Sequence, residues 1–230
     1  MADQPIALVT GAGGALAAPV IARLEDVGWQ LALVAKGPQE RLRERYPNRP
    51  VASVDLTDEA AARKVLARLE QETGGFDAVL NLAGGFAMQA TSELRLEQLQ
   101  QQLSLNLITA MVATTAALPG MLERGHGTII GIAAGQAVDG GARAAAYAAS
   151  KAALVAYLRS LDREFASQGV RSLVIYPMGT LDTGKNRDAM PNADPSDWIA
   201  TASLASAIVH GLTLGPRARF TELKVWPDPS

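Results

Sequence analysis

The chain has 230 residues, enough for one large domain with a full hydrophobic core. Its 21 basic and 23 acidic residues nearly balance, the formal net charge is −2, and basic residues form no long run. This balance argues against nucleic acid or an anionic membrane as the partner. The chain contains no cysteine, which excludes disulfides, thiolate catalysis and sulfur-ligated metals. The two histidines have no partner at metal-ligand spacing, so we expect no bound metal.

The first residues lack the basic segment and apolar stretch that are typical of a secretory signal, and they lead directly into an apolar run. We also expect no uncharged stretch of about 18 residues that could span a bilayer. These two features predict a cytoplasmic protein.

Short apolar runs alternate with longer helical patterns along the whole chain. The expected strands cover residues 6–9, 30–35, 51–54, 78–82, 128–132, 170–175 and 220–225. The expected helices cover residues 15–27, 38–45, 59–72, 94–122, 144–167 and 204–212. Most strands are continuous apolar runs, as in strands that are covered on both faces. The alternation predicts an α/β fold with a doubly wound, Rossmann-type parallel sheet of seven strands, in a single domain over residues 1–230.

One irregular segment, residues 177–198, joins a strand to a late helix and is rich in Pro, Gly and Asn. Connections of this length in a compact domain are usually functional lids or disordered segments. It follows the carboxyl end of a strand, the edge at which doubly wound sheets bind ligands, so we expect a lid. The alternative is a surface loop held in place by Trp198.

A glycine-rich turn follows the first strand and opens the first helix. It contains Gly11, Gly13 and Gly14, and Leu16 lies next to it. Small residues at such a turn let backbone N–H groups approach a pyrophosphate at the helix N-terminus. The turn therefore predicts a dinucleotide site, and the alternative is tight packing of the helix on the strand.

The end of the second strand bears on the choice of dinucleotide. A carboxylate there would bind the ribose 2′-hydroxyl and select NAD, but the residue at this point is Lys36. A cation can accept a 2′-phosphate, which favours NADPH over NADH. Arg41, in the basic segment that follows, is a further candidate for this phosphate, although the segment also fits a solvated helix face. The alternative for Lys36 is a solvated residue at a strand end.

Tyr147 and Lys151 are four residues apart in a helical pattern, which places both side chains on one face. A nearby ammonium favours the phenolate, so we expect Lys151 to lower the pKa of Tyr147 and to make it a proton donor. The alternative is a half-buried tyrosine beside a solvated lysine.

The Tyr-x-x-x-Lys pair and the glycine-rich turn resemble the short-chain dehydrogenase/reductases. The resemblance implies that Tyr147 supplies a proton, that Lys151 binds the nicotinamide ribose, and that Asn106 helps to hold a water in a proton path. It also implies that Asp55 and Leu56 receive the adenine ring. In most of that family a serine lies thirteen residues before the tyrosine, but Ala134 stands there in this chain. Family members bind NAD or NADP and form dimers or tetramers, so we expect a homodimer or homotetramer that acts on a small molecule.

The complete set of expected cofactor-binding residues is Gly11, Gly13, Gly14, Leu16, Lys36, Asp55, Leu56, Asn81, Ala83, Gly84, Tyr147, Lys151 and Thr183. The expected catalytic residues are Tyr147, Lys151 and Asn106. In two places the glycine-rich turn departs from the family, which usually has glycine at the positions of Ala15 and Ala17.

A narrower resemblance lies in the irregular segment. Thr-Leu-Asp-Thr at residues 180–183, Asn-Arg at 186–187 and Met-Pro at 190–191 are similar to the dihydropteridine reductases and related bacterial reductases. Those enzymes also have alanine at the position of Ala134, and their Ala-Gly-Gly-Trp resembles the sequence that ends at Phe86. The resemblance implies reduction of a quinonoid dihydropterin or a similar conjugated carbonyl or imine. The alternatives are a ketone or 3-oxoacyl reductase and a non-catalytic dinucleotide-binding protein.

Overall fold

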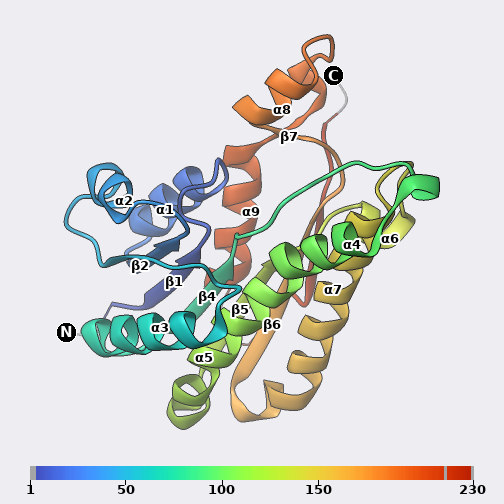
Figure 1. Ribbon diagram of the computed structural model, residues 1–230. Coiled ribbons are helices and arrows are strands. Elements are labelled where there is room, and N and C mark those ends of the chain that lie inside the picture. The colour runs from blue at the N-terminus through green and yellow to red at the C-terminus, as the bar shows by residue number, and fades with distance from the viewer. Residues whose placement is uncertain (1–3, 215–216, 229–230) are drawn as a thin grey trace.

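Seven parallel strands form the main sheet of the protein, seen in a computed structural model that describes residues 4–214 and 217–228 (Figure 1). The sheet order is β3-β2-β1-β4-β5-β6-β9. The strands are β1 (Ile6–Thr10), β2 (Gln30–Ala35), β3 (Val51–Ser53), β4 (Ala78–Asn81), β5 (Gly127–Ile132), β6 (Val170–Pro177) and β9 (Glu222–Val225). This arrangement confirms the predicted doubly wound α/β sheet, and all seven strands occur where the apolar runs placed them.

Helices cover both faces of the sheet, and each face has its own hydrophobic core (Figure 1). Side chains of α1 (Ala17–Asp26) and α9 (Thr201–Thr213) fill one core, and those of α3 (Glu59–Thr73), α5 (Thr109–Arg124) and α7 (Ala145–Phe165) fill the other. In β1, Ala7 and Val9 point into the first core while Leu8 points into the second. Because both faces are buried, the strand is apolar at consecutive positions, from Ile6 to Val9, rather than at every second one.

The predicted helix over residues 94–122 is interrupted in the structure. A short 3₁₀ turn (Thr91–Glu93) is followed by α4 (Leu96–Leu103), a π-helical turn (Ser104–Ile108) and α5. Such π-helical turns are rare and are frequent at functional sites. Asn106 lies inside this turn and is its fully buried residue, so the irregular turn places a buried polar side chain next to the cleft.

The same region corrects the expectation about membrane-spanning stretches. The helical run from Leu96 to Arg124 is long enough to cross a membrane and contains an 18-residue window with a mean hydropathy of 1.5. The expectation that no such stretch exists was therefore wrong, because this helix meets the length and composition of a membrane-spanning helix. In the fold, α5 packs on α3 and on strands β4 and β5, and α4 packs on α7. Its apolar side chains therefore belong to a helix layer that covers the sheet.

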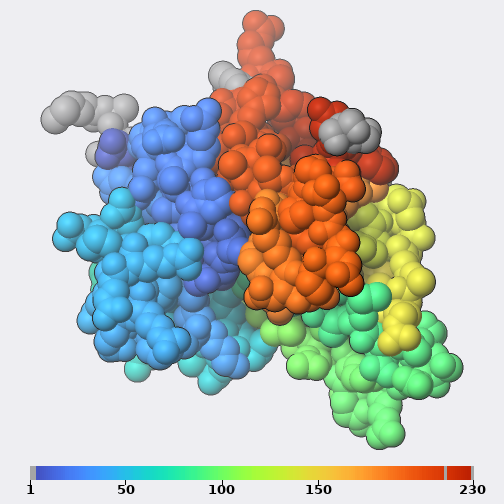
Figure 2. Space-filling view, turned by 90° about the horizontal axis from the view of Figure 1, so that it is seen from above, coloured from blue at the N-terminus to red at the C-terminus, as the bar shows by residue number. Residues whose placement is uncertain are grey.

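The irregular segment 177–198 contains more regular structure than predicted. Two short strands, β7 (Leu181–Asp182) and β8 (Ile199–Ala200), pair with each other, and between them lie α8 (Gly184–Ala189) and a 3₁₀ turn (Pro195–Asp197). Seen from above, the segment lies over the middle of the molecule, between the part formed by α1 and α2 (Gln39–Arg45) and the part formed by α4 and α6 (Gln136–Asp139) (Figure 2).

Candidate functional site

A cleft of about 610 Å³ lies at the carboxyl ends of β1, β2, β3 and β4. The strand order reverses between β1 and β4, and ligands of doubly wound sheets bind at this switch point. The volume is within the roughly 300–1,000 Å³ that is usual for small-molecule sites. Position and size therefore suit an elongated ligand that crosses the sheet edge.

Eight of the residues predicted to bind a cofactor line this cleft. They are Gly11, Gly13, Gly14, Lys36, Asp55, Leu56, Ala83 and Gly84. Gly11 has a φ of +66°, and a Cβ atom added to it would lie 2.6 Å from the backbone nitrogen of Ala83. Only glycine fits this position, because any side chain would collide with the neighbouring strand end.

The structure places three other predicted cofactor residues outside the cleft lining. Leu16 packs against the core, and the buried side-chain amide of Asn81 donates to the hydroxyl of Thr114. Thr183 caps α8, since its hydroxyl accepts a hydrogen bond from the backbone N–H of Asn186 at 3.2 Å. Their positions give these three side chains structural roles in this conformation.

Lys36 forms an ion pair with the carboxylate of Asp55. Its ammonium donates to Asp55 at 2.6 Å, and this contact is the main reason why the pKa of Asp55 is lowered to about 2. We expected Lys36 to be a free cation for a phosphate and Asp55 to receive adenine, but the structure joins the two into one ion pair. Both side chains line the cleft, so any ligand that binds there meets the pair.

Arg45 provides a second cation, beside the glycine-rich turn. Its guanidinium donates to the carbonyl of Gly13 at 3.1 Å, and the hydroxyl of Tyr46 donates to the carbonyl of Ala12 at 3.1 Å. The end of α2 therefore braces the glycine-rich turn. Arg41 is the candidate that the sequence suggests in this segment, whereas Arg45 makes the contact within the part of the chain that the structure describes.

Tyr147 and Lys151 lie on one face of α7, as their spacing predicted. The Lys151 ammonium is 6.0 Å from the centroid of the Tyr147 ring and donates to the carbonyl of Ile132 at 2.7 Å. Burial lowers the pKa of Lys151 to about 8 and raises the pKa of Tyr147 to about 12. The expected lowering of the tyrosine pKa by the lysine is thus wrong for this arrangement, because desolvation of the phenol is not offset by a close ammonium.

Asn106 connects α7 to the loop after β4. Its side-chain amide donates to the carbonyl of Gly85 at 2.9 Å and to the hydroxyl of Ser150 at 3.0 Å, and its oxygen accepts from the N–H of Gly85 at 3.0 Å. A Cβ atom on Gly84 would lie 2.8 Å from this oxygen and 3.4 Å from the Lys151 nitrogen. The loop can therefore approach both side chains only because residue 84 is glycine.

Two further side chains, Ser150 and Gln102, contact Asn106 and are not among the site residues predicted from the sequence. Ser150 does donate to the carbonyl of Tyr147 within the helix, but it also accepts the hydrogen bond from Asn106. The side-chain oxygen of Gln102 accepts a longer bond from Asn106, at 3.3 Å. The signal that could have found both residues is their spacing, since Gln102 precedes Asn106 by one helical turn and Ser150 precedes Lys151 directly.

The position that a second hydroxyl donor would occupy is apolar. Ala134 is buried between the end of β5 and the start of α6. The ring of Phe86 lies edge-on to the ring of Tyr147, with centroids 4.8 Å apart, and 49% of Phe86 is exposed. The ring of Tyr147 therefore has a half-exposed aromatic neighbour, and Ala134 offers no side-chain hydroxyl at the position where the family usually has serine.

Comparison with known proteins decides the family. The model of the family described as "short chain dehydrogenase" matches residues 5–193. The chain belongs to the short-chain dehydrogenases. An oxidoreductase from Staphylococcus aureus (strain MW2), described as uncharacterized, is 26% identical over 96% of both chains. A similarly described oxidoreductase from Staphylococcus epidermidis is 28% identical over 97% of both.

A short-chain dehydrogenase from Streptomyces avermitilis has the same fold, with a TM-score of 0.86 over 98% of this chain and 89% of that one, at 23% identity. The 230-residue chain itself is therefore an oxidoreductase of a family that generally binds NAD or NADP. Its cleft at the switch point is the part of the molecule that suits such a dinucleotide.

Proposed function

We propose that this short-chain dehydrogenase is an NADPH-dependent reductase in which Tyr147 is the proton donor and the substrate is an activated, conjugated acceptor such as a quinonoid dihydropterin. The observation that carries the proposal is the environment of Tyr147, which has alanine in place of the usual second donor and a half-exposed phenylalanine at its ring. Each part of the proposal rests on a different set of contacts.

The cleft residues fit a nicotinamide dinucleotide. Gly11, Gly13 and Gly14 leave the start of α1 open to a pyrophosphate. Lys36 brings positive charge to the end of the cleft where a 2′-phosphate would lie, and Arg45 brings positive charge to the adjacent glycine-rich turn. When bound, the reduced nicotinamide supplies a hydride. NADH is the alternative, and Asp55 favours it because the carboxylate partly neutralises Lys36.

Tyr147 is suited to give a proton rather than to take one. Burial raises its pKa to about 12, so the phenol is protonated at neutral pH and still more acidic than an alcohol. Lys151 is held by the carbonyl of Ile132 and keeps a charge below a pH of about 8. Asn106 fixes the loop at Gly85 and the helix at Ser150, which keeps the donor in place. These properties favour reduction over oxidation.

The substrate class follows from the missing hydroxyl. Reduction of a simple ketone places negative charge on one oxygen, and each donor to such an oxygen is worth roughly 2.7–4 kcal/mol. With Ala134 in the place of the serine, Tyr147 is left as the side-chain donor, which suits an acceptor that needs a hydride and one proton but develops little oxyanion. The exposed ring of Phe86 offers a flat surface for a conjugated ring system. The similarity of residues 180–191 to the dihydropteridine reductases supports the same class.

Oxidation of NADPH by the purified protein tests the proposal, with a quinonoid dihydropterin, a simple β-ketoester and no acceptor as the three conditions. We expect turnover with the dihydropterin and little with the β-ketoester. Faster turnover of the β-ketoester would instead identify a ketone or 3-oxoacyl reductase. Tight NADPH binding without turnover of either acceptor would identify a non-catalytic dinucleotide-binding protein, which is the role that the alanine at position 134 would also fit.

A further inference from the structure

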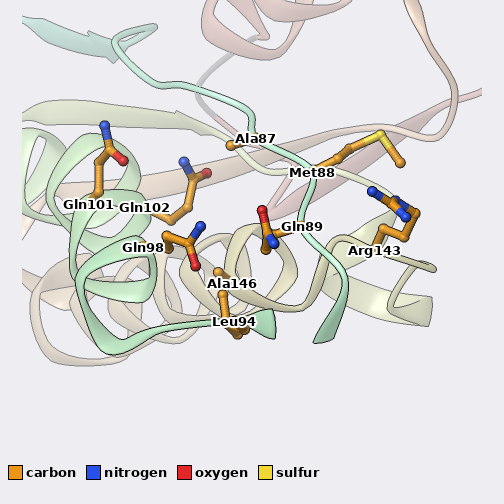
Figure 3. A pocket seen from close by; sticks show the side chains of 9 residues that line it. All are labelled: Ala87, Met88, Gln89, Leu94, Gln98, Gln101, Gln102, Arg143 and Ala146. Carbon is orange, nitrogen blue, oxygen red and sulfur yellow. The ribbon is translucent and has the colours of Figure 1, made fainter. Parts of the chain in front are cut away.

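A second cavity lies beside the candidate site. It has a volume of about 130 Å³ and is formed by the loop after β4, by α4 and by the start of α7 (Figure 3). We call it the glutamine pocket, after Gln98, Gln101 and Gln102 on one side; Arg143 and Met88 lie on the opposite side. A buried water needs roughly 10–15 Å³ of such space. The pocket is therefore large enough for a polar substituent of a ligand.

The pocket adjoins both parts of the site. Gln101 lines the dinucleotide cleft as well as the pocket. Ala146 lines the pocket and directly precedes Tyr147, while Ala87 follows Phe86, whose ring contacts Tyr147. A substrate that lies against Phe86 and Tyr147 therefore has this pocket next to it.

The side chains of the pocket carry unused hydrogen-bond donors. Gln102 is only 3% exposed, and its oxygen accepts from Asn106. Among the described residues, no acceptor is bonded to its side-chain nitrogen, which leaves two N–H donors at the pocket wall. Gln89 is different, because its amide donates to Glu93 at 2.8 Å. The unpaired N–H groups of the nearly buried Gln102 thus indicate that a ligand with a hydrogen-bond acceptor binds in the pocket.

Arg143 has a backbone conformation that its side chain disfavours. Its φ is +59°, in the left-handed region that glycine adopts readily and in which a residue with a large side chain is strained. The carbonyl of Arg143 accepts a hydrogen bond from the backbone N–H of Gln89 at 2.8 Å, which holds the strained residue to the opposite loop. Within residues 4–214 and 217–228, its guanidinium forms no ion pair. Strain of this kind at a pocket indicates that the side chain has a function there.

We infer that the glutamine pocket binds a carboxylate on the substrate, with Arg143 supplying the charge and Gln102 an additional N–H donor. A planar guanidinium matches a carboxylate with two parallel hydrogen bonds, and neutral amide donors complete its shell. The inference rests on the proposed function, since it narrows the acceptor to a conjugated carbonyl or imine that carries an acidic substituent. Arg143 then acts as a specificity-determining residue.

Benzoate and benzamide test this inference without turnover, because they have nearly the same shape and differ in charge. Their dissociation constants are measured by calorimetry on the protein saturated with NADPH, so that the dinucleotide cleft is occupied. The wild-type protein should bind benzoate at least about tenfold more tightly than benzamide, the scale of a charge-assisted pair. Equal binding of the two probes would overturn the inference.

Variants of the pocket locate the effect. Arg143→Gln and Arg143→Gly should remove the preference for benzoate, and Gln102→Met should reduce it, whereas Arg163→Gln, at an exposed arginine near the other end of α7, should leave it intact. Arg143→Gly should also keep or raise Tm, because glycine relieves the strained φ, and a merely structural arginine would not combine these two effects. A preference that survives in both Arg143 variants would overturn the inference.

The outcomes also separate this inference from the proposed function. If benzoate is preferred but neither acceptor is reduced, the carboxylate-binding pocket is supported and the proposed reductase activity is overturned. If the dihydropterin is reduced but the two probes bind equally, the proposed reductase activity is supported and the carboxylate-binding pocket is overturned.

Discussion

The ammonium of Lys36 lies 2.6 Å from the carboxylate of Asp55, at the end of the cleft formed by β2 and β3. The Lys36 side chain is 78% exposed and that of Asp55 37%. Ion pairs with this exposure are worth about 0–1 kcal/mol, so a phosphate can displace the carboxylate at little cost. Cofactor preference therefore depends on both residues rather than on Lys36 alone.

Asp55→Asn should strengthen the preference for NADPH over NADH by up to about fivefold, because it removes the carboxylate that competes with a 2′-phosphate for Lys36. Lys36→Asp should shift the preference towards NADH, because it replaces attraction of the phosphate by repulsion. Dissociation constants of both dinucleotides, measured by fluorescence titration, provide the check. If neither variant changes the ratio, Lys36 is only a solvated residue at the end of a strand.

Tyr147→Phe should lower kcat by at least about a hundredfold, the usual scale for the loss of a positioned proton donor. The affinity for NADPH should barely change, since the ring and its contact with Phe86 remain. Tyr157→Phe, ten residues along the same helix, is the matched control and should retain most of the activity. Near-normal turnover by the Tyr147 variant would exclude it from the mechanism.

Lys151 should make stability depend on pH. Burial lowers its pKa from 10.5 to about 8, so between these two pH values the unfolded chain binds more protons than the folded one. Stability therefore rises with pH across this window, and the cost of the buried charge, roughly 3 kcal/mol, is fully present below about pH 8. Urea denaturation of the wild type and of Lys151→Met at both ends of the window measures the effect.

In that comparison, the wild type should gain free energy of unfolding relative to Lys151→Met as the pH rises, while titrations that the two proteins share cancel. A constant difference would mean that Lys151 titrates alike in the folded and unfolded states.

The segment 177–198 is expected to act as a lid. It is held by the β7–β8 pair and by an ion pair between Asp182 and Arg187, and Met190 is partly exposed near its middle. Hydrogen exchange of its amides should slow when NADPH binds, because the segment follows the carboxyl end of β6 and lies over the middle of the molecule (Figure 2). Equal protection with and without the dinucleotide would indicate a surface loop instead.

The fold could be predicted from the sequence because the apolar runs and helical patterns are local signals. The glycine-rich turn and the spacing of Tyr147 and Lys151 were also visible, since a turn and a helix face depend on neighbouring residues. The partnership of Lys36 with Asp55 could not be predicted, because it joins the ends of two different strands.

Two further features lay beyond local patterns. The pKa of Tyr147 was predicted in the wrong direction, because burial depends on the whole fold. The π-helical turn at Asn106 requires contacts with the loop at Gly85, which a helical pattern over residues 94–122 does not reveal. The homodimer or homotetramer, the lid and the individual site roles stay predictions.

The most direct test of the account is the ratio of kcat/KM for a quinonoid dihydropterin to that for a β-ketoester, measured in the wild type and in Ala134→Ser. The account predicts a large ratio in the wild type. It also predicts that the new hydroxyl raises the β-ketoester value at least about tenfold, since one donor to a developing oxyanion is worth roughly 2.7–4 kcal/mol. A wild type that already reduces the β-ketoester as efficiently as the dihydropterin, with no gain in Ala134→Ser, would contradict it.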